Sequence, residues 1–106
     1  MRKTIRNYAA LAAIIVMTGA MGFAQAGQAT FKAKCQSCHG ADGTPNPGIA
    51  KMMGVKPASD PSVKAHSEDE MIAITANGKD KMPAFKGKLS DEEIKTSVEY
   101  FRTFMK

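Results

Sequence analysis

The pentapeptide Cys35–His39, with the sequence CQSCH, constrains this chain more than any other stretch. Two thiols three positions apart, followed directly by a histidine, are typical of covalent haem attachment. Each thiol can form a thioether with one haem vinyl group, and the imidazole of His39 is a suitable ligand for iron. The two thiols could instead form a disulfide, a thioredoxin-like redox pair or half of a zinc site. Haem attachment is the preferred interpretation, because the chain has no βαβ pattern, no third cysteine and only His66 as a further histidine.

A second motif, Lys81-Met82-Pro83, lies downstream of CQSCH. On these two motifs the chain resembles the small class I c-type cytochromes, which are single-haem electron carriers. The resemblance covers nearly all of the chain after residue 26. It implies an all-α, small cytochrome c fold in which three to four helices wrap around one covalently bound haem c. It also implies that the protein is an electron carrier and not an enzyme.

Met82 is the expected second axial ligand, since it lies in a loop beside Pro83, whose ring fixes the backbone and removes a donor. The other methionines after residue 26 are Met52, Met53, Met71 and Met105. The last two fall on apolar sides of expected helices, where methionine commonly fills the core. The first two are weaker candidates for the ligand, as is His66. His39 and Met82 together would leave no open position on iron, which suits electron transfer.

Residues 40–48 combine glycine and proline at a density typical of an irregular loop. In the family, the carbonyl of a loop proline accepts a hydrogen bond from the second nitrogen of the proximal histidine and fixes its ring. Pro47, which precedes Gly48, resembles the family pattern more closely, and Pro45 is the alternative. Both prolines could also simply stiffen a turn.

A first helix is predicted over residues 28–36, because Gly27, Phe31 and Cys35 recur every four residues and share one helix face. In the family, the glycine permits a close crossing by the last helix, and a C-terminal aromatic residue packs there. Tyr100 is the best match for that aromatic residue.

Two later helices carry capping boxes as start signals, at Ser67–Glu70 and Ser90–Glu93. The first should run to about Ala76, before Asn77-Gly78. The second carries a helical stripe of apolar residues, which are Ile94, Val98, Phe101 and Met105. A short helical turn is expected over residues 49–54, and a linker over residues 55–61.

The first 26 residues read as a signal peptide, with a basic start, an apolar stretch and the small-residue cleavage site Ala24-Gln25-Ala26. An uncleaved membrane anchor is the alternative, but the apolar stretch is short for a full span. Cleavage after Ala26 would leave residues 27–106 as one monohaem cytochrome c domain in the periplasm, without stable membrane insertion. Haem attachment to paired thiols fits an exported protein.

Charge and size bound the function further. The formal charge is +5, but the first 26 residues contribute three bases and no acid, so residues 27–106 are near +2. Arg102 is the one arginine after residue 26, and no basic helix face stands out, which argues against nucleic-acid binding. A domain this small has a thin core, and a covalently held haem would supply its apolar centre.

The docking surface is expected near Met82, where four lysines fall within ten residues. These are Lys79, Lys81, Lys86 and Lys88. A positive rim around the haem edge would steer acidic redox partners, although loop lysines are often simply solvated. Two other functions stay open. One is a subunit of a larger oxidoreductase, and the other is a haem enzyme or ligand sensor with an open distal position.

Overall fold

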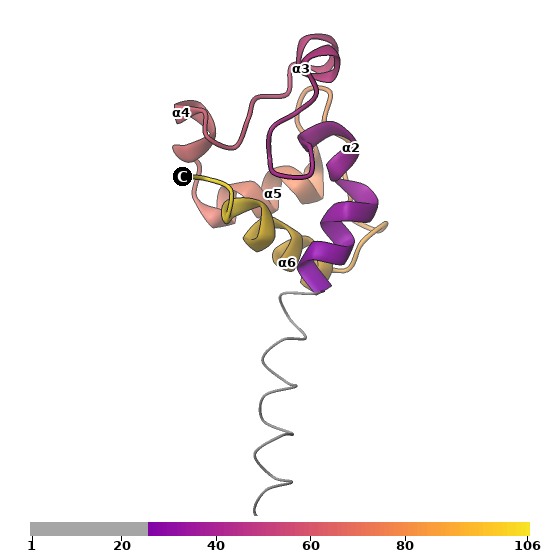
Figure 1. The fold of residues 1–106 in the computed structure, drawn as a ribbon. Coiled ribbons are helices and arrows are strands. Elements are labelled where there is room, and N and C mark those ends of the chain that lie inside the picture. Colours follow the sequence, from indigo (N-terminus) through magenta and orange to yellow (C-terminus); the bar gives the residue numbers. More distant parts are fainter. Residues whose placement is uncertain (1–25) are drawn as a thin grey trace, which may run out of the picture.

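Within residues 26–106, which a computed structural model describes, every regular element is a helix (Figure 1). A first helix covers residues 26–34. It is followed by α2 (Gln36–His39), α3 (Pro47–Met53), α4 (Pro61–Lys64), α5 (Glu68–Asn77) and α6 (Asp91–Arg102). Two isolated β-bridges, Lys79 to Met82 and Lys86 to Leu89, also occur in the described residues, but neither belongs to a strand. The predicted all-α class is therefore confirmed.

The predicted signal peptide falls almost entirely on residues 1–25, which lie outside the described residues. Among the helices of residues 26–106, none has the length and apolar character needed to cross a membrane.

The first helix and α2 form one nearly continuous stretch that carries the CQSCH motif. The helix begins two residues before the predicted start, and a single turn at Cys35 separates it from α2. The backbone N–H of His39 donates to the carbonyl of Cys35 (3.0 Å), so the motif is helical where its three functional side chains project. Gly40 ends α2 with φ at +81°, and a Cβ there would collide with the Thr44 backbone. The chain therefore turns away directly after the histidine.

The two short helices begin with the same kind of start signal. Asn46 and Asp60 each accept a hydrogen bond from a backbone N–H two residues later, and a proline occupies the first helical position. The structure thus moves the predicted turn at 49–54 forward to Pro47–Met53. It also adds α4, which begins at Pro61, the last residue of the expected linker, and continues to Lys64.

Both predicted capping boxes are present. The side-chain oxygens of Ser67 and Ser90 accept from the N–H of Glu70 and Glu93, and each glutamate accepts in return from the serine N–H. Acidic residues fill the first turn of α5 and of α6, where they complement the helix dipole. The first of these helices ends at Asn77, one residue beyond the predicted end.

The core centres on the crossing of the first helix and α6. Gly27 lies so close to α6 that a Cβ at this position would come within 2.4 Å of the Thr96 carbonyl oxygen. Phe31 is 2% exposed and packs on Tyr100, with ring centroids 5.3 Å apart. Tyr100 therefore packs at the crossing, as the family pattern implies, while Thr96 is the α6 residue that Gly27 accommodates.

Residues 78–89, here termed the distal loop, connect α5 to the start of α6. Its tip is a tight turn in which the N–H of Met82 donates to Lys79 O and the N–H of Lys79 donates to Met82 O. Its second half is tied to α5, since the N–H groups of Phe85 and Lys86 donate to carbonyls of the last turns of that helix. The loop is thus held to α5 at Phe85 and Lys86, whereas the turn that carries Met82 makes backbone hydrogen bonds only within itself.

Candidate functional site

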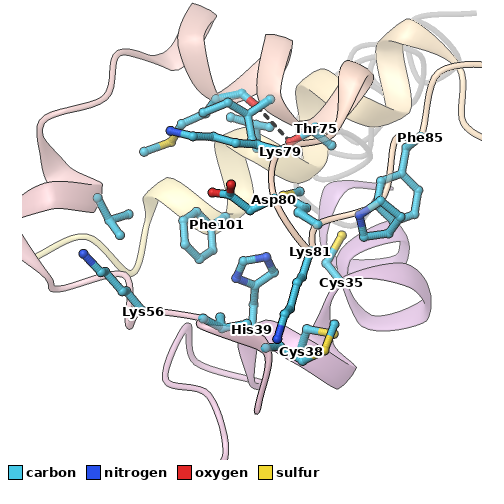
Figure 2. Close-up of a pocket in the computed structure, with 18 of the residues that line it drawn as sticks. Cys35, Cys38, His39, Lys56, Thr75, Lys79, Asp80, Lys81, Phe85 and Phe101 are labelled. Atoms are coloured by element: carbon cyan, nitrogen blue, oxygen red, sulfur yellow. Dashed lines mark hydrogen bonds between the residues drawn. The ribbon is translucent and has the colours of Figure 1, made fainter. Parts of the chain in front are cut away.

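A cavity of about 450 Å³ opens between the CQSCH stretch, the α3–α4 segment, α5, the distal loop and α6 (Figure 2). This volume falls within the roughly 300–1,000 Å³ typical of small-molecule and cofactor sites. Cys35, Cys38, His39 and Met82 all line it. The structure therefore brings together, around one space, four of the five residues that the sequence marked as cofactor-binding.

The two thiols lie on the wall formed by the first helix and α2, both half-buried. Burial, with a further contribution from Cys38, raises the pKa of the Cys35 thiol to about 11. Both cysteines are free, and Figure 2 shows them on the same side of the cavity. Both thiols are therefore presented to the same cavity.

The imidazole of His39 projects from α2 into the cavity between Phe101 and Lys81 in Figure 2. Its ring meets Phe101 edge to face, with centroids 5.2 Å apart. Burial lowers the pKa of His39 and so favours the neutral ring, which is the form that binds metals. Its Nδ1 is buried and has no hydrogen-bond partner among the described residues.

Met82 faces the same cavity from the distal loop, on a separate chain segment from His39. Met53 and Met71 also line the space, but Met52 is 64% exposed and does not. The sulfur of Met71 accepts a hydrogen bond from the Nη1 of Arg102 at 3.6 Å, so this thioether already has a partner within the protein.

His66 lines the cavity too, so the structure keeps it near the site. Its Nδ1 is bound to the Glu70 carboxylate at 3.1 Å, as part of an exposed i, i+4 pair on the start of α5. The hydrogen bond lowers the pKa of Glu70. His66 therefore directly precedes the capping box at the start of α5.

The two candidate prolines occupy different environments. Pro47 is exposed and is the first residue of α3, a position that proline favours because its missing N–H is not needed there. Pro45 is buried. Neither proline lines the cavity. The structure thus accounts for Pro47 as a helix-start residue.

The charged residues of the cavity rim differ from the expected set. The four lysines that line the cavity are Lys34, Lys56, Lys79 and Lys81, accompanied by Asp80. Lys86 and Lys88 are exposed but do not line it. Sequence reasoning missed the first two lysines because it searched only around Met82, although Lys34 directly precedes Cys35.

The donor set fits a covalently attached haem. Two thiols and a neutral imidazole lie on one wall, a thioether lies on another segment, and Phe31, Val98 and Phe101 add apolar surface between them. Fold and cavity together define a small helical protein built around one covalently held cofactor.

Comparison with known proteins leads to the same class. Residues 22–101 match the family model described as cytochrome c oxidase, cbb3-type, subunit III. The chain is 38% identical to cytochrome c6 of Leptolyngbya boryana over 73% of its own length and 87% of the relative. It is 40% identical to cytochrome c6 of Anabaena variabilis, over 70% and 83% of the two chains.

A solved structure agrees with these sequences. The KustC0563 c-type cytochrome superposes with a TM-score of 0.67 at 32% identity, covering 76% of this chain and 98% of the other. The chain therefore belongs to the cytochrome c family, as a small class I c-type cytochrome with one covalently bound haem c. It is an electron carrier between redox partners and not an enzyme.

Proposed function

We propose that this protein is an exported, periplasmic electron carrier whose haem has His39 and Met82 as its axial ligands. The signal peptide, residues 1–26, would be removed after Ala26, leaving the monohaem domain at 27–106. Separation of periplasm from membranes, followed by N-terminal sequencing of the mature protein, tests the localisation and the cleavage site.

The observation that carries this proposal is the single cavity that gathers Cys35, Cys38, His39 and Met82. Cys35 and Cys38 would hold the haem through thioethers, and His39 would supply the proximal nitrogen. The haem supplies one-electron iron chemistry, and thioether ligation raises the potential relative to two nitrogen ligands. Phe31, Val98 and Phe101 would provide apolar contacts for the haem.

His39 needs a partner for its Nδ1, because metal-binding histidines almost always donate their second ring nitrogen to an oxygen. Because the Nδ1 of His39 is buried without a partner, we expect a backbone carbonyl to accept its hydrogen bond when haem is bound. Between the two family candidates, we favour Pro45, because it is buried in the loop after α2 while Pro47 begins α3 at the surface.

Carbon monoxide tests whether both axial positions are filled. The ferrous protein should bind it poorly at neutral pH, because His39 and Met82 leave no open position, whereas Met82→Ala should bind it readily. Ready binding by the native protein would favour an open distal site, as in a haem enzyme or ligand sensor.

Docking is proposed to use the cavity rim, defined here by Lys34, Lys56, Lys79 and Lys81, with acidic redox proteins as partners. Opposite charges speed transient encounters of this kind. Small oxidants of known charge test it: hexacyanoferrate(III) as the anion and tris(1,10-phenanthroline)cobalt(III) as the cation. Replacing the four rim lysines by glutamine should slow oxidation by the anion and not by the cation.

A matched control removes four lysines outside the cavity, namely Lys64, Lys86, Lys88 and Lys95, all exposed. It changes the net charge equally, so it isolates the position of the charge. Work at low salt is needed, because screening is strong once the Debye length is about 8–10 Å. Equal slowing by both variants would leave only the general effect of net charge.

A second candidate function is a subunit of a larger oxidoreductase, favoured by the description of the matching family model. A native-size measurement on material from gently solubilised membranes separates the two. A free carrier should migrate as a small protein in the soluble fraction, and a subunit should migrate with the complex.

A further inference from the structure

The tip of the distal loop has one side-chain hydrogen bond to another part of the described chain. The Nζ of Lys81 donates to the carbonyl oxygen of Met52 at 2.7 Å, across 29 positions in sequence. In Figure 2, the side chain of Lys81 reaches from its loop toward the ribbon that carries Cys38. The contact therefore joins the segment of Met82 to the opposite side of the cavity.

The acceptor is well suited to a lysine. Met52 lies in the last turn of α3, where carbonyls have no partner within the helix. The C-terminal end of a helix also carries partial negative charge, which favours a cation. Lys81 thus satisfies an exposed carbonyl and places its charge at a favourable helix end.

The other ties of the loop lie behind its tip. The N–H groups of Phe85 and Lys86 bind carbonyls of α5, and the Lys79–Met82 turn is closed only on itself. Gly78 is the first residue of the loop and Gly87 lies near its end, with φ at +79° and +86°, conformations that glycine adopts without strain. Movement of the tip away from the cavity would therefore break the Lys81–Met52 contact first.

We propose that Lys81 is a positioning residue that holds Met82 against the cavity by binding α3. This inference rests on the proposed role of Met82 as distal ligand. It assigns to Lys81 a task that neither Lys79 nor Lys86 shares, since neither side chain makes a hydrogen bond among the described residues. Lys81 then slows displacement of Met82, whatever its contribution to partner docking.

Imidazole binding to the ferric holoprotein measures this displacement, because an external ligand can enter only after Met82 has left. Lys81→Leu keeps most of the apolar stem, removes the ammonium and adds no ligand for iron. We expect it to bind imidazole roughly three- to tenfold faster, the effect of losing one exposed hydrogen bond to a charged donor. Lys81→Arg should restore most of the native rate, and Lys86→Leu, with the same charge loss in the same loop, should match the native protein.

The Met82→Ala background distinguishes positioning from simple shielding of the cavity. With no thioether to displace, Met82→Ala should bind imidazole fast, and adding Lys81→Leu should change nothing further. Equal acceleration in both backgrounds would overturn the proposal, as would a native rate in Lys81→Leu beside a fast Met82→Ala. A native rate in Met82→Ala itself would remove the ligand assignment, and the Lys81 proposal with it.

Discussion

Replacing Gly27 by alanine tests the helix crossing that places α6 beside the cavity. A Cβ at this position would lie 2.4 Å from the Thr96 carbonyl oxygen and 3.0 Å from its carbon, where ordinary contact begins at 3.4 Å. Both atoms belong to the backbone, so no side-chain rotation relieves the clash. The two helices must separate by about 1 Å, and overpacking of this kind costs roughly 1–3 kcal/mol.

An opposing term reduces this cost, because alanine is favoured over glycine in a helix by roughly 0.5–1 kcal/mol. The net loss should be about 1–2 kcal/mol. For a domain of this size, this corresponds to a fall in melting temperature of roughly 5–15 °C. Separation of the helices would also shift Phe101, which packs on His39, so the visible spectrum should change with the melting temperature.

Thermal unfolding of the ferric holoprotein, followed by circular dichroism, measures the effect. Gly48→Ala is the matched control, because its Cβ would meet only the side-chain oxygen of Asn46, at 3.3 Å. That variant should be as stable as the native protein or slightly more stable. If Gly27→Ala melts at or above the native temperature, the close crossing is not where the structure places it.

Three further predictions concern attachment, core and caps. Cys35→Ser combined with Cys38→Ser should abolish the haem-stained band on denaturing gels, and a retained band would exclude thioether attachment. Phe31→Ala should cost roughly 3–5 kcal/mol, because the side chain is 2% exposed, and denaturant unfolding of the holoprotein checks this. Ser90→Ala should cost about 1 kcal/mol. The hydrogen bonds with Ser90 also lower the pKa of Glu93 from its ordinary value of 4.5. The stability that ionised Glu93 contributes is therefore present above that pH and is lost on acidification. A Ser90→Ala variant that keeps the native acid dependence of unfolding would contradict this.

Local signals predicted the helix starts of this fold well. The capping boxes at Ser67 and Ser90 depend on side chains within four residues, and both formed as expected. The start of α4 at Asp60 has the same local character and was missed only because the prolines around it were read as a linker. Helix starts of this kind can therefore be predicted from sequence when every possible N-cap residue is considered, including those next to prolines.

Contacts between distant segments were predicted only where a motif fixed them. The spacing of Gly27 and Phe31 identified the helix face at the crossing, but not that Thr96 meets the glycine, since this depends on the packing of α6. The contact of Lys81 with Met52 has no local signal at all.

The candidate site shows the same division. The CQSCH spacing predicted the thiols and the histidine, because all three lie in one helical stretch. The cavity rim required the fold, since Lys34 and Lys56 come from segments far from Met82 in sequence. The choice between Pro45 and Pro47 also needed the fold, because the sequence does not show that Pro45 is buried while Pro47 begins α3 at the surface.

The most direct test of the account is the visible spectrum of the ferric, mature protein in native form and in the Met82→Ala variant. Sulfur-to-iron ligation produces a weak band near the red end of that spectrum. The native protein should show the band at neutral pH, Met82→Ala should lose it, and Met53→Leu and Met71→Leu should keep it. A native protein without the band, or a Met82→Ala variant that retains it, would contradict the assignment of His39 and Met82 as the axial pair.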